Sequence, residues 1–582
     1  MPDTQPAGLK WLWTALAWLV AAAILCVYVA TAAPNAWWGD GMELATAAKV
    51  LGVAHPTGYP LYMVVGHLAI RLMGWMEPGR ATTILNAILL AAASGLTILL
   101  LLRVMAVRNF RTFAIAAGLA MIIASGTTIW EHATITEVYP LTYALCVAVL
   151  SIGWAPSDSR PGLGRGIALG AVTGLASLNH YSILALYPLV ALLVLEWSWQ
   201  GSWARRVGYV AACFFSWLVM LAGFVYLPLR ARANPGMNWG DPRTLENVLW
   251  VLSGGQYRMM NRELWQSGGW HNGSIRWMTW WGDQWLPKGP GWMTAAVGVA
   301  IMAPAIAGLV LLARRRPAFG VGLMFTLVAT FCYSVYYQIS DIDAYFLPAL
   351  PALAIGWVEA GGLVVRRHTI APKWLAVAPA LLAAFMFWAK YPAIDKSFDV
   401  MPDRYAAAVM KALPRDAVLL LEGDNSIFSL WYYQTALGKR PDVSVIATGF
   451  LLEGWYERYF EAAGRPRPPV KVISREPTSK LDWDIDLIYN AVLPCLKAGK
   501  RVFVAYDDVI LEQYFSPRLV ATVPPGPVYR KYTKPNTQLP TSSVWELTPN
   551  PALAAMSREE FRENLANFYI HHVEVVDRPK DE

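Results

Sequence analysis

Residues 11–33 form an apolar run without a charged side chain, and more such runs follow along the first 390 residues. A helix of about 20 apolar residues spans the hydrocarbon core of a bilayer. A cleaved signal peptide is the alternative for the first run, but its length and the later runs favour a retained anchor. We predict eleven spans, at 11–33, 84–102, 112–129, 139–154, 167–181, 182–198, 207–229, 291–313, 318–337, 345–365 and 372–389.

Charged residues divide the chain into two parts. Of 88 charged side chains, 40 fall in the first 390 residues and 48 in the last 192. Charged residues thus make up about 10% of the first 390 residues, against about 25% of a typical soluble domain. We predict a polytopic membrane domain over 1–390 and a separate domain over 391–582. The net charge of +8 arises in the membrane part, where loop Lys and Arg set topology, so it does not indicate a nucleic-acid partner.

Basic residues predict the orientation, because they concentrate in cytoplasmic loops. The clusters of Lys and Arg between the predicted spans all lie on the same side of the membrane only if residues 61–75 do not cross it. We therefore predict a cytoplasmic N-terminus, an extracytoplasmic tail, and two short helices, 41–52 and 61–75, at the outer surface. Eleven of the 15 acids in the membrane part then fall on the outer side. An outer cavity lined by acids explains this one-sided distribution, and outer loops that are simply longer and more solvent-exposed are the alternative explanation.

The tail has the pattern of a small α/β domain. A helical segment around 401–413 precedes strand-like residues 418–424, a helical stretch 426–437 and strand-like residues 443–447, with a third strand at 501–506. No glycine-rich phosphate loop follows these strands, so we expect no independent active site there. We interpret 517–550 as an irregular closing segment.

Four stretches near outer span ends carry candidate chemistry. In the first, Asp40 and Glu43 are spaced i, i+3 at a helix start, where the helix dipole favours carboxylates; an ordinary N-cap is the alternative. In the second, Glu137 and Tyr139 lie with another acid and a histidine at a span mouth. Such groups are unfavourable at membrane depth unless they line a wet cavity. His180 ends a span on the same side.

In the third stretch, Arg230 and Arg232 lie on the outer side against the positive-inside trend, which suggests an anionic partner such as a lipid phosphate. Lipid headgroup contact without catalysis is the alternative. In the fourth stretch, Asp341 and Asp343 precede Tyr345. These acids could support a divalent metal together with Asp40 or Glu43, but no specific metal motif is present, and no cofactor is required by the sequence.

Together these stretches resemble a family of polytopic GT-C glycosyltransferases that includes the eukaryotic transmembrane O-mannosyltransferase of plexin-type receptor domains. The likeness extends over about 40–460. It rests on Asp40-Gly-Met-Glu43, Gly52-Val-Ala-His55-Pro-Thr-Gly-Tyr59-Pro, Glu137-Val-Tyr139, Asn179-His180, Leu227-Pro-Leu-Arg230, Asn238-Trp239-Gly-Asp241-Pro, Gln256-Tyr257, Asp341-Ile-Asp343-Ala-Tyr345, Gly423-Asp424-Asn425, Trp431-Tyr-Tyr433 and Arg440-Pro-Asp-Val443. Gly41 and Thr57 stand where many relatives have Ser and Pro.

The resemblance implies a membrane α-helical GT-C fold with about eleven transmembrane helices, two outer juxtamembrane helices and a small α/β extracytoplasmic domain. It also implies inverting transfer of a mannose-like sugar from a polyprenyl-phosphate donor to a hydroxyl on a protein or glycan acceptor, outside the bacterial inner membrane. Asp40 is the expected general base, with Glu43 and Glu137 orienting the acceptor or tuning Asp40. Expected donor-binding residues are His55, Tyr59, Tyr139, His180, Arg230, Arg232, Trp239, Asp241, Gln256 and Tyr257, with Asp341, Asp343 and Tyr345 in support.

Two other classes remain open. Outer acids and arginines on a polytopic chain also suit a transporter or flippase of lipid-linked sugars, which would move the substrate without chemistry. The predicted spans are nearly free of charge, which argues against it. A non-catalytic assembly subunit whose tail recruits partners is the third class.

Overall fold

The computed structural model describes residues 7–155, 161–199, 202–257, 269–285, 290–337, 339, 342–367, 377–462, 467–473, 479–505, 515–523, 542–549 and 556–572. The chain forms two compact units. Unit 1 comprises Met1–Ala36, Pro56–Leu227 and Trp250–Phe398, and unit 2 comprises Trp37–His55, Pro228–Leu249 and Asp399–Glu582. Unit 2 therefore contains two segments from within the predicted membrane domain.

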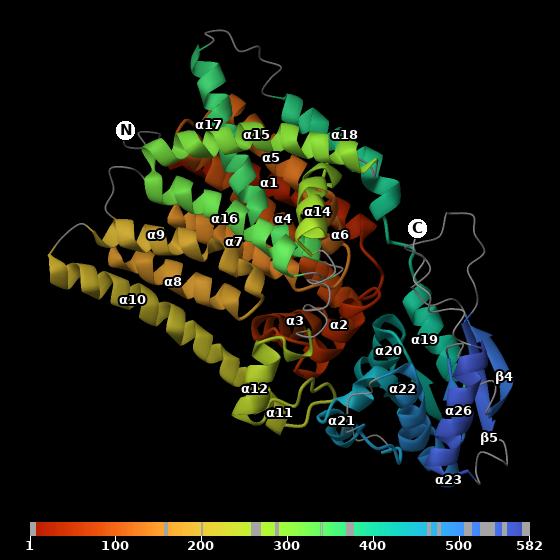
Figure 1. Cartoon of the computed structure of the whole chain (residues 1–582). Coiled ribbons are helices and arrows are strands. Elements are labelled where there is room, and N and C mark those ends of the chain that lie inside the picture. The colour runs from red at the N-terminus through yellow and green to blue at the C-terminus, as the bar shows by residue number, and fades with distance from the viewer. Residues whose placement is uncertain are drawn as a thin grey trace. The chain divides into compact units, whose positions relative to one another are not determined.

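Unit 1 is helical in its described residues (Figure 1). Its long helices are joined by short connections and 3₁₀ turns, and α11 and α12 extend across the unit boundaries. The elements are α1 (Ala7–Thr31), α3 (Pro60–Leu72), α4 (Pro78–Met105), α5 (Phe110–Ala124), α6 (Thr127–Ala133), α7 (Tyr139–Gly153), α8 (Leu163–Ser177), η1 (Tyr181–Leu186), α9 (Tyr187–Ser198), α10 (Trp203–Leu221), η2 (Ala222–Val225), α11 (Tyr226–Arg232), α12 (Leu245–Leu252), η3 (Gly255–Tyr257), α14 (Gly269–Asp283), α15 (Gly291–Arg315), α16 (Pro317–Tyr336), η4 (Ile342–Phe346), α17 (Ala349–Arg367) and α18 (Ala378–Ile394).

Each of the eleven predicted spans overlaps one or more of these helices. Among the described residues, six helical segments are long and apolar enough to cross a membrane, or seven if the bent pair α5 and α6 forms one span. The protein is thus an integral membrane protein, and the number eleven stays a prediction. The predicted span 112–129 is not one straight helix, because α5 and α6 meet at an angle of 72°. The break falls at Ser125 and Gly126, a residue pair at which helices commonly kink.

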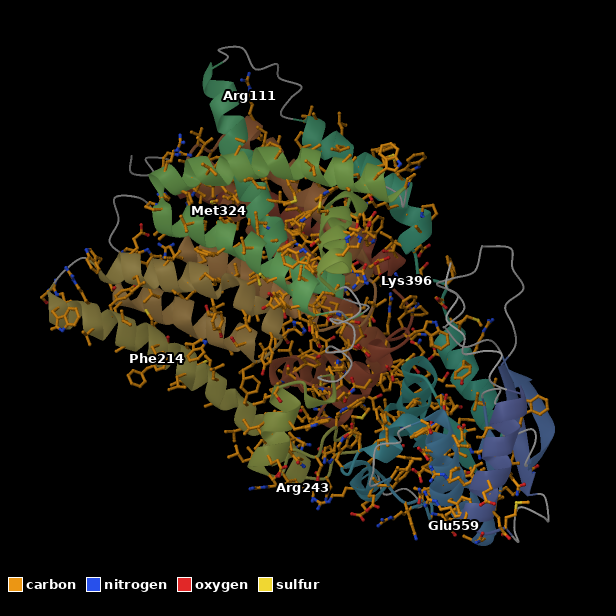
Figure 2. All side chains as sticks on the ribbon, viewed as in Figure 1. Arg111, Phe214, Arg243, Met324, Lys396 and Glu559 are labelled. Carbon is orange, nitrogen blue, oxygen red and sulfur yellow. The ribbon has the colours of Figure 1, made fainter. Side chains whose placement is uncertain are left out.

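Helix α10 illustrates how unit 1 meets lipid. Its outward side chains are large and apolar, and Phe214, Phe215 and Val219 are more than half exposed; Figure 2 labels Phe214 on this helix. Water would make such exposure unfavourable, whereas lipid tails do not. Its other face packs on α8 through Gly170 and Gly174, where a Cβ atom would collide with the α10 backbone. Small residues allow this close approach of membrane helices.

Unit 2 is built around a five-stranded sheet with the order β2-β1-β3-β5-β4. Strands β1, β2 and β3 are parallel, whereas β5 pairs antiparallel with β3 and β4. The elements are α2 (Asp40–Val50), α19 (Met401–Ala412), β1 (Val418–Leu421), α20 (Asp424–Trp431), η6 (Tyr432–Ala436), β2 (Ser444–Ala447), η7 (Thr448–Leu452), α21 (Tyr456–Ala462), α22 (Lys480–Leu487), η8 (Ile488–Val492), α23 (Leu493–Lys497), β3 (Val502–Val504), β4 (Phe515–Val523), β5 (Ser542–Pro549) and α26 (Arg558–His572).

The predicted strands at 418–424, 443–447 and 501–506 and the helix between the first two are confirmed. The prediction of an irregular segment over 517–550 is wrong, because this stretch contains most of β4 and all of β5, which pair with each other. The prolines in this stretch favoured an irregular segment over strands. Pro517 lies in β4, which is the edge strand of the sheet, where the missing backbone N–H of proline is tolerated.

Helix α2 lies inside unit 2. The sequence predicts a helix at 41–52, which is confirmed, and places it on the outer membrane surface. All residues from Gly41 to Ala48 are buried, and the helix packs against α20 and η6; its place at the membrane surface stays a prediction. Protein therefore surrounds the helix that carries Asp40 and Glu43.

Candidate active site

Asp40 is the first residue of α2, after Gly39. Gly39 has a φ of 63° and a ψ of −137°, and a Cβ atom there would lie 3.1 Å from the side-chain oxygen of Asn425. Glycine is therefore favoured at this turn both by its backbone conformation and by space. The turn places two acids of different accessibility one helical turn apart: the Asp40 side chain is 39% exposed and that of Glu43 is 0% exposed.

His55 joins these two acids. One Glu43 oxygen, Oε1, accepts the backbone N–H of His55 at 3.0 Å, and Oε2 lies 2.9 Å from the ring atom Nδ1. The other ring nitrogen, Nε2, lies 3.9 Å from Oδ2 of Asp40. The buried carboxylate of Glu43 thus fixes the ring, and the opposite edge of the ring faces the accessible carboxylate of Asp40.

A short parallel bridge holds the segment before His55. Val53 pairs with Asn238: the Val53 N–H donates to the Met237 carbonyl at 3.0 Å, and the Trp239 N–H donates to the Val53 carbonyl at 3.1 Å. The Trp239 ring then meets the His55 ring edge to face, with centroids 6.1 Å apart. Trp239 was predicted to bind donor, but it is buried among four aromatic rings, those of Phe428, Trp431, Phe450 and Trp455.

Asp424 is a site residue that the sequence analysis quoted only as part of the family likeness. It is accessible to solvent and begins α20, three residues after the carboxyl end of β1, the strand that lies between β2 and β3 in the sheet. Ligands commonly bind at such a switch point of a parallel sheet. The pKa of Asp424 is raised, first because surrounding protein displaces water and also because of Glu43, while His55 acts in the opposite direction. Asp424 therefore lies within electrostatic range of His55 and Glu43.

Asp241, which was predicted to bind donor, is engaged by protein side chains in the structure. It is 3% exposed, and its carboxylate lies 2.8 Å from Nε of Arg243 and 2.9 Å from Nη1 of Arg458, while Asn238 donates to it at 2.8 Å. Each carboxylate oxygen is engaged by these neighbours. Asp241 thus ties the loop after Trp239 to α21 and is placed to support the bridge rather than to contact a donor.

Arg230 contacts the end of α2. Its Nε donates to the Leu51 carbonyl at 2.6 Å, and one Nη donates to the Val50 carbonyl at 3.3 Å. A guanidinium at this position satisfies carbonyls that a helix C-terminus leaves unpaired and interacts favourably with the dipole. Arg230 is half-buried, whereas Arg232, predicted beside it, is exposed.

In unit 1 the structure brings four predicted residues from separate motifs into one aromatic group, which we call the His180 cluster. The His180 ring contacts Tyr345 at 4.6 Å and Tyr139 at 4.8 Å in edge-to-face geometry, and it stacks with Tyr59 at 5.9 Å. All distances are between ring centroids. No local spacing could have placed Tyr59 and Tyr345 around one histidine ring, because both contacts depend on the packing of unit 1.

The His180 ring has a defined tautomer. Its Nδ1 accepts the backbone N–H of Ser182 at 3.1 Å, which caps the 3₁₀ turn η1. A nitrogen that accepts a hydrogen bond carries no proton, so in the neutral ring the proton is on Nε2. His180 therefore presents an N–H donor inside the cluster of tyrosine rings, which is suited to an oxygen-rich ligand.

Glu137 is held through its backbone. The buried side chain of Asn86 donates to the carbonyls of Ile135 and Glu137 at 2.9 and 2.8 Å, and Tyr62 donates to Asn86 at 3.2 Å. This network fixes the turn that leads into Tyr139. Glu137 itself is half-buried in unit 1.

The remaining predicted residues are dispersed. Gln256 and Tyr257 are half-buried in η3 of unit 1. Asp341 lies outside the described residues. Asp343 lines a cavity of about 310 Å³ together with residues of α14, among them Arg276, Trp280 and Asp283. Within the described ranges there is no group of three or more His, Cys, Asp or Glu side chains that could hold a metal ion.

The predicted residues thus fall into two groups, each described within its own unit. Unit 2 holds Asp40, Glu43, His55, Arg230, Arg232, Trp239 and Asp241, and unit 1 holds Tyr59, Glu137, Tyr139, His180, Gln256, Tyr257, Asp343 and Tyr345.

Sequence comparisons agree with the predicted extent of the likeness. The family model "Protein O-mannosyl-transferase TMEM260 N-terminal domain" matches residues 40–203, and "TMEM260-associated domain 2" matches residues 402–476. The Protein O-mannosyl-transferase TMEM260 of Mus musculus is 23% identical over 466 residues, which cover 75% of this chain and 63% of that protein. The chain therefore spans less than two thirds of this curated relative.

Solved structures show the fold. ArnT from Cupriavidus metallidurans bound to undecaprenyl phosphate has a TM-score of 0.55 at 14% identity, covering 93% of this chain and 99% of ArnT. Its apo state has a TM-score of 0.52 at 14% identity, covering 95% of this chain and all of ArnT. The chain is therefore an integral membrane protein with the GT-C fold, related in sequence to the TMEM260 protein O-mannosyl-transferases.

Proposed function

We propose that this protein is a membrane glycosyltransferase that moves a mannose-like sugar from a polyprenyl-phosphate donor to a hydroxyl of a protein acceptor, with inversion. The observation that carries the proposal is the Asp40 group: an accessible carboxylate at a helix start, faced by a histidine that a buried acid holds. A positioned carboxylate can take the acceptor proton while the hydroxyl attacks opposite the leaving phosphate.

The comparisons support the substrate classes. ArnT was solved with undecaprenyl phosphate, and the mouse relative is named a protein O-mannosyl-transferase. The His180 cluster suits the donor, because aromatic faces stack on sugars and the Nε2–H of His180 can donate to sugar or phosphate oxygens. Arg232 is exposed and could stabilise negative charge on the leaving phosphate, a task that commonly contributes a few kcal/mol.

Burial divides the roles of the acids. Asp40 is accessible and is the proposed base, whereas Glu43 is enclosed and bonded to His55, so we assign it to positioning rather than to acceptor contact. The proposed orientation remains that of the charge pattern, with the site and C-terminal part outside the bacterial inner membrane. A glycan acceptor is a further outcome that the assay below would reveal, and the same assay repeated with a chelator would reveal a divalent metal requirement.

The test uses the full chain in nanodiscs with radiolabelled polyprenyl-phosphate mannose and an envelope fraction as acceptor. Wild type should release free polyprenyl phosphate and label the acceptor. Asp40→Asn should lower the rate by a factor of about 10² to 10⁴, as expected for loss of a general base. The matched control is Glu461→Gln, an exposed acid paired with Arg467, which should keep the wild-type rate.

Near-normal transfer by folded Asp40→Asn would overturn the assignment of the base. Labelled lipid that crosses the bilayer of proteoliposomes without release of polyprenyl phosphate would instead favour the transporter.

A further inference from the structure

The Glu43 carboxylate depends on His55. Its side chain is fully enclosed, and both of its oxygens are directed at His55, one at the backbone N–H and one at ring Nδ1. A buried carboxylate is strongly unfavourable unless it is paired with a charge and hydrogen-bonded. The ring of His55 is the basic side chain that the structure places on Glu43. This contact assigns the proton on Nδ1 to the bond with Glu43 and leaves Nε2 as the atom that faces Asp40.

The contact between His55 and Asp40 is of another kind. The separation of 3.9 Å between Nε2 and Oδ2 is too long for a hydrogen bond but is within the range of an ion pair. An uncharged ring would therefore contribute little to Asp40. A protonated ring would attract its carboxylate directly.

The surroundings of the ring favour the charged form. Two acids from α2 face it, Asp40 at 3.9 Å and Glu43 at 2.9 Å, and a third acid, Asp424 of α20, lies within electrostatic range. The fourth neighbour, Trp239, packs against the ring and carries no charge. Opposite charges within about 4–6 Å stabilise the protonated imidazole, and the imidazolium in turn stabilises the carboxylates.

We infer that His55 is a positively charged positioning residue, clamped by Glu43, that keeps Asp40 ionised and aligned for proton abstraction. This inference rests on the proposed function, in which Asp40 is the general base. In the reaction the proton of the acceptor hydroxyl moves to Asp40, the hydroxyl oxygen bonds to the anomeric carbon, and the bond from that carbon to the polyprenyl phosphate breaks. His55 keeps both of its protons throughout, so it acts on Asp40 and not on the substrate.

The distinguishing measurement is the pH profile of release of polyprenyl phosphate. In His55→Gln the cation is lost while a polar side chain remains, so Asp40 loses the positive charge that offsets the carboxylate of Glu43 one helical turn away. The acid limb of the profile, where Asp40 takes up its proton, should move up by about one pH unit or more. At higher pH the rate should return to within about tenfold of wild type, because Asp40 is ionised there in both proteins.

The double variant His55→Gln/Glu43→Gln supplies a rescue test. It removes the acid whose charge opposes ionisation of Asp40, so its acid limb should move back toward that of wild type. A merely structural role for the pair predicts the reverse, a rate that falls further and equally at all pH values. His271→Gln is the matched control, since His271 is exposed on α14 in unit 1, and it should leave the profile unchanged.

The outcomes separate the two proposals. An unchanged acid limb in folded His55→Gln, or no return in the double variant, would overturn the role of His55 while Asp40→Asn stays inactive. Full activity of Asp40→Asn would overturn the proposed function itself. If His55→Gln does not elute as a monodisperse protein, Glu43→Gln is measured alone. In Glu43→Gln the His55 ring has lost the partner that favours its protonation. The transfer rate of this variant should therefore become sensitive to deprotonation of His55 at neutral pH. A pH profile identical to that of wild type would contradict the inference.

Discussion

Gly52→Ala tests whether the bridge between Val53 and Asn238 holds the candidate site. A Cβ atom on Gly52 would fall on the carbonyl oxygen of Met237 and would lie 3.0 Å from the Met237 Cβ. Both partners are fixed, because Gly52 follows the cap of α2 and Met237 is buried. The two segments must therefore separate if a methyl group is added.

The cost follows from the bonds that this separation breaks. The bridge contains hydrogen bonds of 3.0 Å from Val53 to Met237 and 3.1 Å from Trp239 to Val53, and a shift of about 1 Å would take both beyond bonding range. Each broken bond in a buried site costs about 1 to 2 kcal/mol. We expect Gly52→Ala to destabilise unit 2 by about 2 to 4 kcal/mol, which lowers the unfolding temperature of a unit of this size by about 4 to 16 °C.

The assay is thermal unfolding in detergent followed by tryptophan fluorescence, which senses the ring cluster of Trp239, Trp431 and Trp455 in unit 2. Gly454→Ala is the matched control, because a Cβ atom there meets nothing within 4 Å, and it should stay within about 0.5 kcal/mol of wild type. The transfer rate should fall in Gly52→Ala, since His55 lies three residues further on. If Gly52→Ala unfolds at the temperature of wild type, the bridge does not hold the site as argued.

Four other predictions address single residues. Asp424 has a raised pKa, so its contribution to stability is full below the ordinary value of 3.8 and declines as pH rises; Asp424→Asn should therefore gain unfolding temperature over wild type toward neutral pH. Asp442, whose pKa is lowered by its hydrogen bond with Arg440, should show the opposite sign: Asp442→Asn should lose unfolding temperature at neutral pH and match wild type in acid. Asn86→Leu leaves two buried carbonyls without their donor, and it should cost about 2 to 4 kcal/mol and lower the transfer rate, whereas an unchanged unfolding temperature would contradict the network. His180→Phe keeps the ring contacts but removes the N–H donor, so KM for radiolabelled polyprenyl-phosphate mannose should rise about tenfold or more, and an unchanged KM would remove His180 from donor binding.

The sequence by itself determined the division into apolar and charged parts, the helices that the apolar runs form, and the first three strands of the sheet. These features depend on local composition and periodicity, which are properties of consecutive residues. Two expectations failed for different reasons. The strands within 517–550 depend on where a segment sits in the sheet, since a proline is tolerated on an edge strand but not in the middle of a sheet. The bend in the span 112–129 falls at Ser125 and Gly126, a local pair inside a run that is otherwise apolar.

Tertiary structure alone decided what each candidate residue contacts. The sequence singled out Asp40, Glu43 and Asp241 but not their surroundings. Packing leaves Asp40 accessible, encloses Glu43 against His55, and pairs Asp241 with two arginines. Tertiary structure also placed Asp424 within electrostatic range of Glu43 and His55, which lie more than 350 positions earlier in the chain. The physical reason is that burial and charge pairing depend on which segments pack together, and no local pattern in the chain encodes that choice.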